Sequence, residues 1–169
     1  MAKKPAMILY HTGLIVENLD DAMETMGDAL GLSWFTPRKA SSPFQSPGGF
    51  LDREVRFTYS LQGPHFIEIL EQIDPAPYLH VTGGRRIHHL GYYTDDLPAA
   101  AHWLEDHGYR MELNGVDHDG NVARATFHYN PESPGMWIEL VAHEVAVEVG
   151  TEMARAAKEL GIDFRSPFP

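Results

Sequence analysis

The chain contains an imperfect internal repeat, and this repeat restricts the possible folds more than any other feature of the sequence. The segment HTGLIVENLDDAMETMGDALGL begins at His11 and aligns with HLGYYTDDLPAAAHWLEDHGY, which begins at His89. In both segments a glycine stands two residues after the histidine. A second pair of segments, FIEIL and WIELV, places Glu68 in register with Glu139. The same features repeated in the same order indicate one structural unit that is used twice.

Each half of the chain is predicted to form a strand, a helix and further strands, which gives a βαβββ unit twice. A glycine follows each predicted helix, Gly31 in the first half and Gly108 in the second, as is common at helix ends. The predicted helices span 19–30 and 97–107, and the predicted strands span 8–16, 53–61, 65–72, 87–94, 110–114, 122–129 and 136–142.

The predicted modules are residues 1–72 and 87–144, joined by a linker at 73–86 that contains proline and glycine. The polar segment 36–49 contains three prolines and is predicted to be a long loop, of the kind that often forms a lid or a binding site. Residues 145–169 are predicted to be a carboxy-terminal helix and tail. The helix is amphipathic, so we expect it to pack on its own chain, with a second subunit as the alternative.

The alternation of side chains along a strand predicts where the repeated residues point. Each repeated histidine shares a face with the glycine that follows it. His88 is expected to face away from His89 and to have either a structural role or a role in supporting the metal ligand. Glu68 and Glu139 lie in the middle of strands among apolar residues. A carboxylate is unfavourable there unless it is paired, protonated or bound to a cation. Two histidines and two glutamates at matching positions therefore predict one shared site between the halves.

The composition limits the chemistry of this site and the partners of the chain. The sequence has no cysteine, so disulfides and thiolate zinc sites are excluded and a metal must bind nitrogen and oxygen. A formal net charge of −11 argues against nucleic acid as a partner. There is no signal-peptide-like or membrane-spanning apolar run, so we expect no membrane association and a cytoplasmic location. An acidic substrate requires local positive charge, for which the candidates are Arg38, Lys39, Arg53, Arg56, Arg85 and Arg86, although such residues are most often surface charges.

Four segments, HTGLIVENLDDA, PHFIEIL, HHLGYYTDDLPAA and GMWIELV, resemble the strand motifs of the vicinal oxygen chelate superfamily. This superfamily includes glyoxalase I, methylmalonyl-CoA epimerase, extradiol ring-cleaving dioxygenases and the fosfomycin and bleomycin resistance proteins. The resemblance covers about residues 8–142. It implies an α+β fold in which two tandem βαβββ modules form a cupped mixed β-sheet around one divalent metal ion. By the same resemblance, the metal ligands are His11, Glu68, His89 and Glu139.

This implied ligand set predicts a reaction next to a carbonyl group. Two imidazoles and two carboxylates suit zinc, nickel, cobalt, manganese or iron. A substrate with two neighbouring oxygens would chelate such an ion, which would stabilise the enolate formed when an adjacent proton is lost. We predict that Glu139 takes the proton, with Glu68 as the second candidate. The chain is thus predicted to be a metal-dependent isomerase, epimerase or lyase, similar to the glyoxalase I or methylmalonyl-CoA epimerase branch.

Three alternatives stay open at the level of sequence. An Fe(II) extradiol-type dioxygenase needs two histidines and one carboxylate, which would leave Glu68 surplus. A non-catalytic binding protein for a small molecule, such as an antibiotic, would use the same cup, although such members often lack ligands. The four residues can also form a buried hydrogen-bonded cluster without metal, in which Arg56 or Arg124 pairs with the glutamates.

Apolar side chains on the ligand face are predicted to line a substrate cavity. They are Tyr93, Trp137, Phe66 and Ile15, and the three aromatic rings among them favour an apolar or planar substrate. We therefore expect a small-molecule substrate with adjacent oxygens as the partner, and association into a homodimer is a further expectation.

Overall fold

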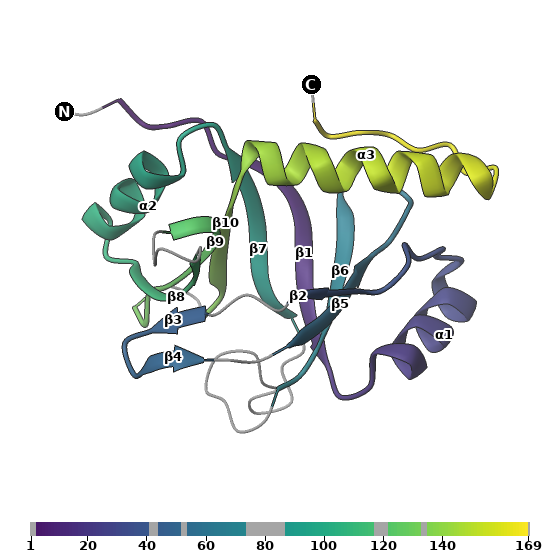
Figure 1. Cartoon of the computed structure of the whole chain (residues 1–169), viewed down its shortest axis with the longest axis horizontal. Coiled ribbons are helices and arrows are strands. Elements are labelled where there is room, and N and C mark those ends of the chain that lie inside the picture. Colours follow the sequence, from purple (N-terminus) through teal and green to yellow (C-terminus); the bar gives the residue numbers. More distant parts are fainter. Residues whose placement is uncertain are drawn as a thin grey trace.

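The computed structural model describes residues 3–40, 44–51, 54–73, 87–116, 122–132 and 135–168. The strands are β1 (Ile8–Val16), β2 (Arg38–Ala40), β3 (Phe44–Ser46), β4 (Gly49–Leu51), β5 (Val55–Tyr59), β6 (Phe66–Glu71), β7 (Ile87–Thr94), β8 (Arg110–Val116), β9 (Val122–Tyr129) and β10 (Trp137–Ala142). The helices are α1 (Leu19–Leu30), α2 (Leu97–Asp106) and α3 (His143–Glu159). The ten strands of the described residues form one mixed sheet in the order β2-β5-β6-β1-β7-β10-β9-β8-β3-β4 (Figure 1).

The two halves of the sheet have the same arrangement, which confirms the predicted pair of βαβββ units. In the first half β1 and α1 are followed by β2, β5 and β6, and in the second half β7 and α2 are followed by β8, β9 and β10. The first strand of each half pairs in parallel with the last, β1 with β6 and β7 with β10. β1 and β7 pair antiparallel at the centre of the sheet, so the two halves meet backbone to backbone.

Helices α1 and α2 lie on opposite sides of the view in Figure 1, and each packs against its own half of the sheet. The Asn18 side chain accepts hydrogen bonds from two backbone N–H groups at the start of α1, and Gly31 ends the helix in the left-handed conformation. α1 packs against Ile67 and Ile69. α2 packs against the equivalent residues of β10, one of which is Leu140. This packing confirms that the residues alternating with the two glutamates face the helices.

The prediction of a long loop at 36–49 is wrong, because this segment contains β2, β3 and the first residue of β4. β2 pairs with β5 at the edge of the first half. β3 and β4 form a hairpin that pairs with β8 at the edge of the second half, so the first half of the chain extends the sheet of the second. Strands of three residues are too short to show an alternating pattern, and the prolines of this segment also favoured a loop.

Helix α3 begins at His143, directly after β10, and crosses the sheet at the top of the view in Figure 1. Its buried face consists of small or flexible residues about one helical turn apart, which are Ala146, Gly150, Met153 and Ala157. Gly150 provides space for the tail, because a Cβ atom at this position would lie 2.3 Å from the ring of Phe168. The helix and the tail thus pack on their own chain, as expected.

Several predicted features lie outside the described residues, namely Arg53, Arg85, Arg86 and most of the linker at 73–86. The boundaries of the two modules stay a prediction. Among the helices of the described ranges, none has both the length and the apolar character needed to cross a bilayer.

Candidate metal centre

The two predicted histidine ligands lie on the antiparallel pair β1 and β7. His11 is opposite Gly91, and His89 is opposite Gly13. Each imidazole occupies the space over the facing glycine: a Cβ atom on Gly13 would be 1.9 Å from His89 Cε1, and one on Gly91 would be 1.9 Å from His11 Cε1. No side chain fits at these two positions. The glycine after each histidine therefore makes room for the histidine of the other half.

The two glutamates come from the strands that flank this pair. Glu68 on β6 is beside Gly13, and Glu139 on β10 is beside Gly91. Each glycine thus has a histidine on one side and a glutamate on the other. All four side chains are buried, with exposed fractions of 0% for both histidines, 3% for Glu68 and 7% for Glu139.

The nitrogen and oxygen atoms of these four residues converge between the two halves. His11 Nε2 and His89 Nε2 are 3.0 Å apart. Glu68 Oε2 lies 3.0 Å from His89 Nε2 and 3.4 Å from His11 Nε2. Glu139 Oε2 lies 2.9 Å from His11 Nε2 and 3.4 Å from His89 Nε2. One such atom from each residue lies within 4.8 Å of all the others, so the predicted ligand set is brought together and can hold a metal ion.

The donor set also fits a divalent cation chemically. Bonds of about 2.0–2.2 Å to nitrogen and oxygen would separate neighbouring ligand atoms by roughly 3 Å, close to the spacing found here. Two carboxylates would balance the charge of the ion inside a buried site. Glu139 Oε2 is buried and has no hydrogen bond of good geometry within the described chain, although His11 Nε2 is 2.9 Å away. A cation among the four atoms would satisfy this oxygen.

Without a cation, the glutamates favour protonated imidazole in the cluster. Burial by itself would lower the pKa of His89, but the close contacts with the Glu139 and Glu68 carboxylates and their charges outweigh burial and raise the pKa to about 9. Burial would raise the pKa of Glu139, but its contacts with His11 and His89 lower the pKa well below its usual range. A metal ion must therefore displace a proton when it binds to this cluster.

Arg56 and Arg124, the alternative partners of the buried glutamates, form other ion pairs. Arg56 donates to Asp20 and Glu71 with N···O distances of 3.0–3.3 Å. Arg124 lies 3.9 Å from Glu148 of α3. Among the described residues, the charges that balance Glu68 and Glu139 at short range are thus those of the two histidines.

The prediction that His88 faces away from His89 is wrong, because β7 has a bulge at this point. Gly13 pairs with His89 and the next residue of β1 pairs with Ile87, so His88 is the extra residue. His88 Nδ1 lies 3.0 Å from His89 Nδ1, and the His88 ring stacks on Trp137 with a centroid distance of 5.2 Å. His88 therefore contacts the side of His89 away from the cluster.

β1 has a matching bulge, in which Tyr10 is the extra residue. Tyr10 precedes His11 in the same way that His88 precedes His89. The Tyr10 hydroxyl hydrogen-bonds to Tyr59, which in turn donates to Glu68. Burial raises the pKa of both phenols well above its usual value, and the nearby glutamates raise it further. These tyrosines therefore stay protonated and can donate hydrogen bonds.

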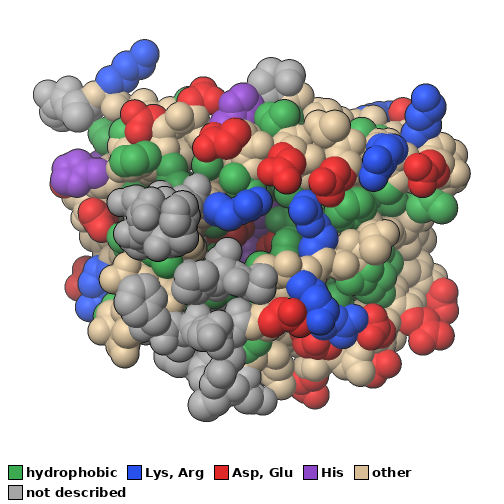
Figure 2. Space-filling model, in the orientation of Figure 1, with side chains coloured by type: hydrophobic (Ala, Val, Ile, Leu, Met, Phe, Trp, Pro, Cys, Tyr) green, Lys and Arg blue, Asp and Glu red, His purple; other side chains and the backbone are tan. Residues whose placement is uncertain are grey.

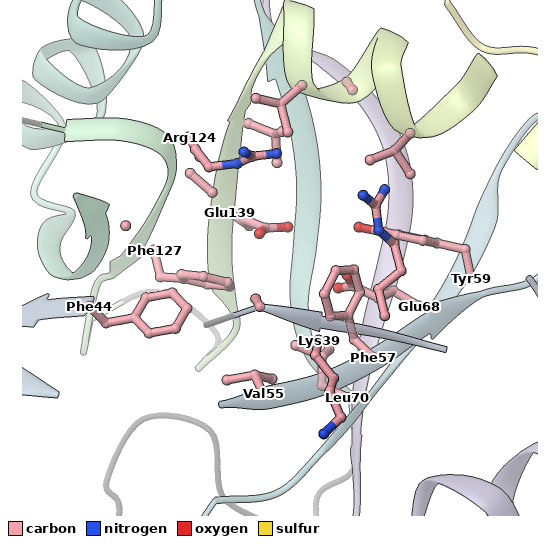
Figure 3. Close-up of a pocket in the computed structure, with 18 of the residues that line it drawn as sticks. Lys39, Phe44, Val55, Phe57, Tyr59, Glu68, Leu70, Arg124, Phe127 and Glu139 are labelled. Carbon is pink, nitrogen blue, oxygen red and sulfur yellow. The ribbon is translucent and has the colours of Figure 1, made fainter. Parts of the chain in front are cut away.

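A cavity of about 320 Å³ opens onto the cluster between the two halves of the sheet (Figure 3). Glu68 and Glu139 line its inner end, which is the buried end, and Figure 3 shows them on two sides of the space. Its walls are mainly apolar, with Val55, Phe57 and Phe127 from the sheet and Val145, Ala146 and Val149 from α3. The sequence did not predict the contribution of α3, because periodicity shows that a helix has an apolar face but not what the face covers.

The four residues predicted to line the substrate cavity lie elsewhere. Tyr93 packs against the tail and donates its hydroxyl to the Pro167 carbonyl, and Phe66 stacks on Phe164. Trp137 stacks on His88, and Ile15 is buried in the apolar core. None of the four is a lining residue of the described cavity. Direct contact between these side chains and a substrate stays a prediction.

Comparison with known proteins assigns the chain to a family. The family described as the glyoxalase/bleomycin resistance protein/dioxygenase superfamily matches residues 10–127. No curated protein sequence matches the chain.

Solved structures that resemble the chain include methylmalonyl-CoA epimerases. The enzyme from Mycobacterium tuberculosis has a TM-score of 0.60 and 22% identity, covering 84% of this chain and 91% of its own. A variant of the Streptomyces coelicolor enzyme, in complex with 2-nitronate-propionyl-CoA, has a TM-score of 0.58 and 19% identity, covering 81% and 98%. A third structure contains methylmalonyl-CoA and an ammonium ion, with a TM-score of 0.58, 20% identity and coverage of 80% and 94%. At these identities the likeness shows the fold, which confirms the predicted α+β class.

Proposed function

The chain belongs to the glyoxalase/bleomycin resistance protein/dioxygenase superfamily, and from this membership we propose that it is a divalent-metal-dependent isomerase or epimerase. The proposed reaction moves a proton at a carbon next to a carbonyl group, in a small molecule with two neighbouring oxygens. The geometry of the cluster and the cavity supports this proposal over simple binding.

In this proposal His11, Glu68, His89 and Glu139 hold the metal ion. When bound, a divalent ion acts as a Lewis acid toward a carbonyl oxygen and makes the neighbouring C–H group more acidic. The protein residues then position the substrate and transfer the proton. The apolar walls of the cavity exclude water from the inner end and so strengthen the electrostatic interactions there.

We propose different roles for the two glutamates. Glu139 pairs in register with Phe127, a side chain without a polar group, so its carboxylate is freer to leave the cluster and accept a proton from the substrate. Glu68 pairs in register with Tyr59, whose hydroxyl donates toward the Glu68 carboxylate. Glu68 would return a proton from the other side of the substrate, and the exchange of a proton between two faces inverts the configuration at carbon.

The observation that carries the proposal is the pair of buried carboxylates at one end of a single cavity, each within 3.4 Å of both histidines. A ring-cleaving dioxygenase uses one carboxylate ligand with two histidines, so the second glutamate would have no role. A binding protein has no need of a buried acid on each side of its ligand. The likeness to epimerase structures with thioesters bound supports acyl thioesters as the first substrates to test.

The proposal is tested by hydrogen exchange. Protein loaded with zinc, nickel, cobalt or manganese is incubated in D2O with acyl-CoA thioesters that carry a second oxygen function on C2, starting with methylmalonyl-CoA, and with hemithioacetals. We expect deuterium to enter next to the carbonyl group, and E139Q to slow this entry by about 10²–10⁴-fold. The matched control is E24Q, because Glu24 is exposed on α1.

Two results of this assay would contradict the proposal. Oxygen consumption by the Fe(II) form with catechols, without exchange in any metal form, would indicate a dioxygenase. Ligand binding without exchange or oxygen consumption would indicate a binding protein.

A further inference from the structure

We propose that the cavity binds an anionic substrate, and that Arg38 and Arg124 hold the anionic group at the mouth, opposite the metal centre. The inference rests on the proposed function, because the other end of the substrate binds at the four-residue cluster. It adds the class of the substrate, which is a molecule with a carboxylate or phosphate group separated from its chelating oxygens by an apolar part.

The first observation is the position of these two arginines. Arg38 comes from β2 in the first half and Arg124 from β9 in the second, and both line the same cavity. Figure 3 shows the Arg124 side chain on the same side of the cavity as Glu139. The side chains of Arg38 and Arg124 are 29% and 53% exposed, whereas the glutamates are buried, so the arginines mark the outer end. This end is the mouth.

The second observation is the sign of the charge around the opening. The chain has a formal net charge of −11 with only 13 lysines and arginines, yet three of these residues line this one cavity. Figure 2 shows lysine or arginine side chains beside a central hollow in a face that is otherwise rich in acidic residues. Such local positive charge opposes the repulsion that an anion would meet from the rest of the molecule.

The third observation is that the arginines have donor capacity left. Arg38 Nη1 is shielded from solvent and forms no hydrogen bond of good geometry within the described residues, although Glu152 Oε2 is 3.3 Å away. Arg124 is 3.9 Å from Glu148. Each guanidinium group has five N–H donors, and exposed ion pairs of this kind are weak. An anion at the mouth can therefore compete with these glutamates.

The two glutamates also show that the arginines can reach one ligand. Glu148 and Glu152 both belong to α3 and are four residues apart, which is about 6 Å along a helix. The two guanidinium groups thus approach α3 about one turn apart. An arginine side chain can donate two parallel hydrogen bonds to a carboxylate or phosphate group. One anion between the two guanidinium groups can therefore accept from both.

The equivalent arginine of the first half shows what a purely structural arginine looks like in this fold. By the strand registers, Arg56 on β5 corresponds to Arg124 on β9. Arg56 hydrogen-bonds to Asp20 and Glu71 at 3.0–3.3 Å and does not line the cavity. Arg124 has the same position in its repeat but a single distant partner, Glu148, among the described residues.

Binding of matched ligands by zinc-loaded protein tests the inference. The probes are 2-oxo acids of increasing chain length that share the same chelating end. Each length is tested with a terminal carboxylate and with the uncharged terminal amide, and a terminal phosphonate separates a preference for phosphate from one for carboxylate. Dissociation constants are measured by calorimetry. At one length, we expect the anionic form to bind at least about tenfold more tightly than the amide.

Three sets of variants distinguish anion binding from a role of the arginines in fastening α3. R38Q/R124Q should remove the preference for the anion and leave binding of the amide unchanged. R110Q, which removes a charge outside the cavity, should keep the preference. E148Q/E152Q removes the carboxylates of α3 that compete for the arginines, so it should keep or increase the preference.

Equal affinity of wild-type protein for the anion and the amide at every length would overturn the inference. Loss of the preference in E148Q/E152Q, to the same extent as in R38Q/R124Q, would also overturn it, because the arginines would then act only through α3. Failure of the wild-type protein to bind zinc would contradict the proposed function instead. The same ligand pairs, titrated into zinc-free protein, would then decide whether the mouth prefers an anion.

Discussion

The first and second repeats supply the same pair of ligands but surround them with different neighbours. In each half the histidine lies over the glycine of the other half, and the glutamate lies on the far side of a glycine. Glu68 is hydrogen-bonded by Tyr59, whereas Glu139 faces Phe127 in the corresponding register. His89 has a partner for Nδ1 in the preceding residue, whereas His11 Nδ1 is buried without a hydrogen-bond partner among the described residues.

This difference separates two requirements of the site. The metal centre needs four donors in a fixed arrangement, and the repeated backbone provides them symmetrically. Proton transfer between two faces of a substrate needs two carboxylates with different surroundings, and residues that are not repeated provide that asymmetry. Substitutions at the repeated positions should therefore abolish metal binding. Substitutions of the neighbours that differ between the repeats should only change the metal affinity or the rate of proton transfer.

The largest effect is expected when the contact shared by the two halves is broken. In G13A or G91A the new methyl group would overlap the imidazole of the opposite half, so metal binding should be abolished. The free energy of unfolding should fall by about 1–3 kcal/mol, because overpacking strains the strands. Metal content and urea unfolding measure these effects. G115A is the control, because the nearest atom to a Cβ there is 3.7 Å away. If only one of G13A and G91A lost the metal, the halves would not be equivalent.

The next effect tests whether the two glutamates differ. E139Q should lower the rate of hydrogen exchange by about 10²–10⁴-fold, the usual contribution of a general base. E68Q should retain exchange at one face of the substrate, because Glu139 is still present, and should lose inversion, because Glu68 no longer returns a proton to the other face. Exchange and inversion are followed separately by deuterium incorporation and by chiral analysis of the product. Identical losses of both activities in the two variants would show that the carboxylates have the same role.

The pH dependence tests the protonation of the cluster without metal. Because the pKa of His89 is raised to about 9, its contribution to the stability of the metal-free protein is present below its unfolded pKa of about 6.5 and is lost as the pH rises through about 9. Zinc competes with this proton, so zinc affinity should rise about tenfold per pH unit up to about pH 9. Thermal melting without metal and chelator competition with zinc give the two curves. A zinc affinity that is constant over this range would contradict the protonated cluster.

A smaller effect is expected from the residue before each histidine. In H88F the partner of His89 Nδ1 is lost, and metal affinity should fall about tenfold, as is common when a hydrogen bond to a ligating histidine is removed. Y10F alters the corresponding position of the first half. It should leave metal affinity nearly unchanged, because Tyr10 hydrogen-bonds to Tyr59 and His11 Nδ1 has no described partner. Equal losses of metal affinity in H88F and Y10F would contradict this difference between the repeats.

The smallest effect is expected when the surroundings of the two glutamates are made alike. Y59F gives Glu68 the same kind of neighbour as Glu139, and it removes the hydroxyl that bonds to both Glu68 and Tyr10, each bond contributing about 0.5–1.5 kcal/mol of stability. It should also reduce the difference in exchange rate between E68Q and E139Q, when these are measured in the Y59F background. F127Y is the reciprocal variant. An unchanged difference in both backgrounds would show that the tyrosine does not distinguish the two carboxylates.

The sequence predicted the features that are repeated. The order of histidine, glycine, helix and glutamate gave the two βαβββ units and the four residues that converge, because each feature appears twice in the same register. The end of the first helix at Gly31 followed from the local preference for glycine after a helix, which does not depend on the rest of the fold.

The features that the sequence did not predict depend on tertiary contacts. The bulge that turns His88 toward Trp137 breaks the alternation from which the direction of a side chain is inferred. The hairpin of β3 and β4 is too short to show a pattern and pairs with the other half of the chain. Tyr93 and Phe66 have the expected alternation but are covered by the tail, whose position no local pattern determines.

The central claim is that both halves together hold one metal ion, and the metal content of anaerobically purified protein tests it most directly. We predict about one divalent ion per chain in the wild type by elemental mass spectrometry, and almost none in either H11A or H89A. H107A is the control, because His107 is exposed on the surface after α2. No metal in the wild type after soaking in divalent salts, or full retention in either H11A or H89A, would contradict a centre shared by the two repeats.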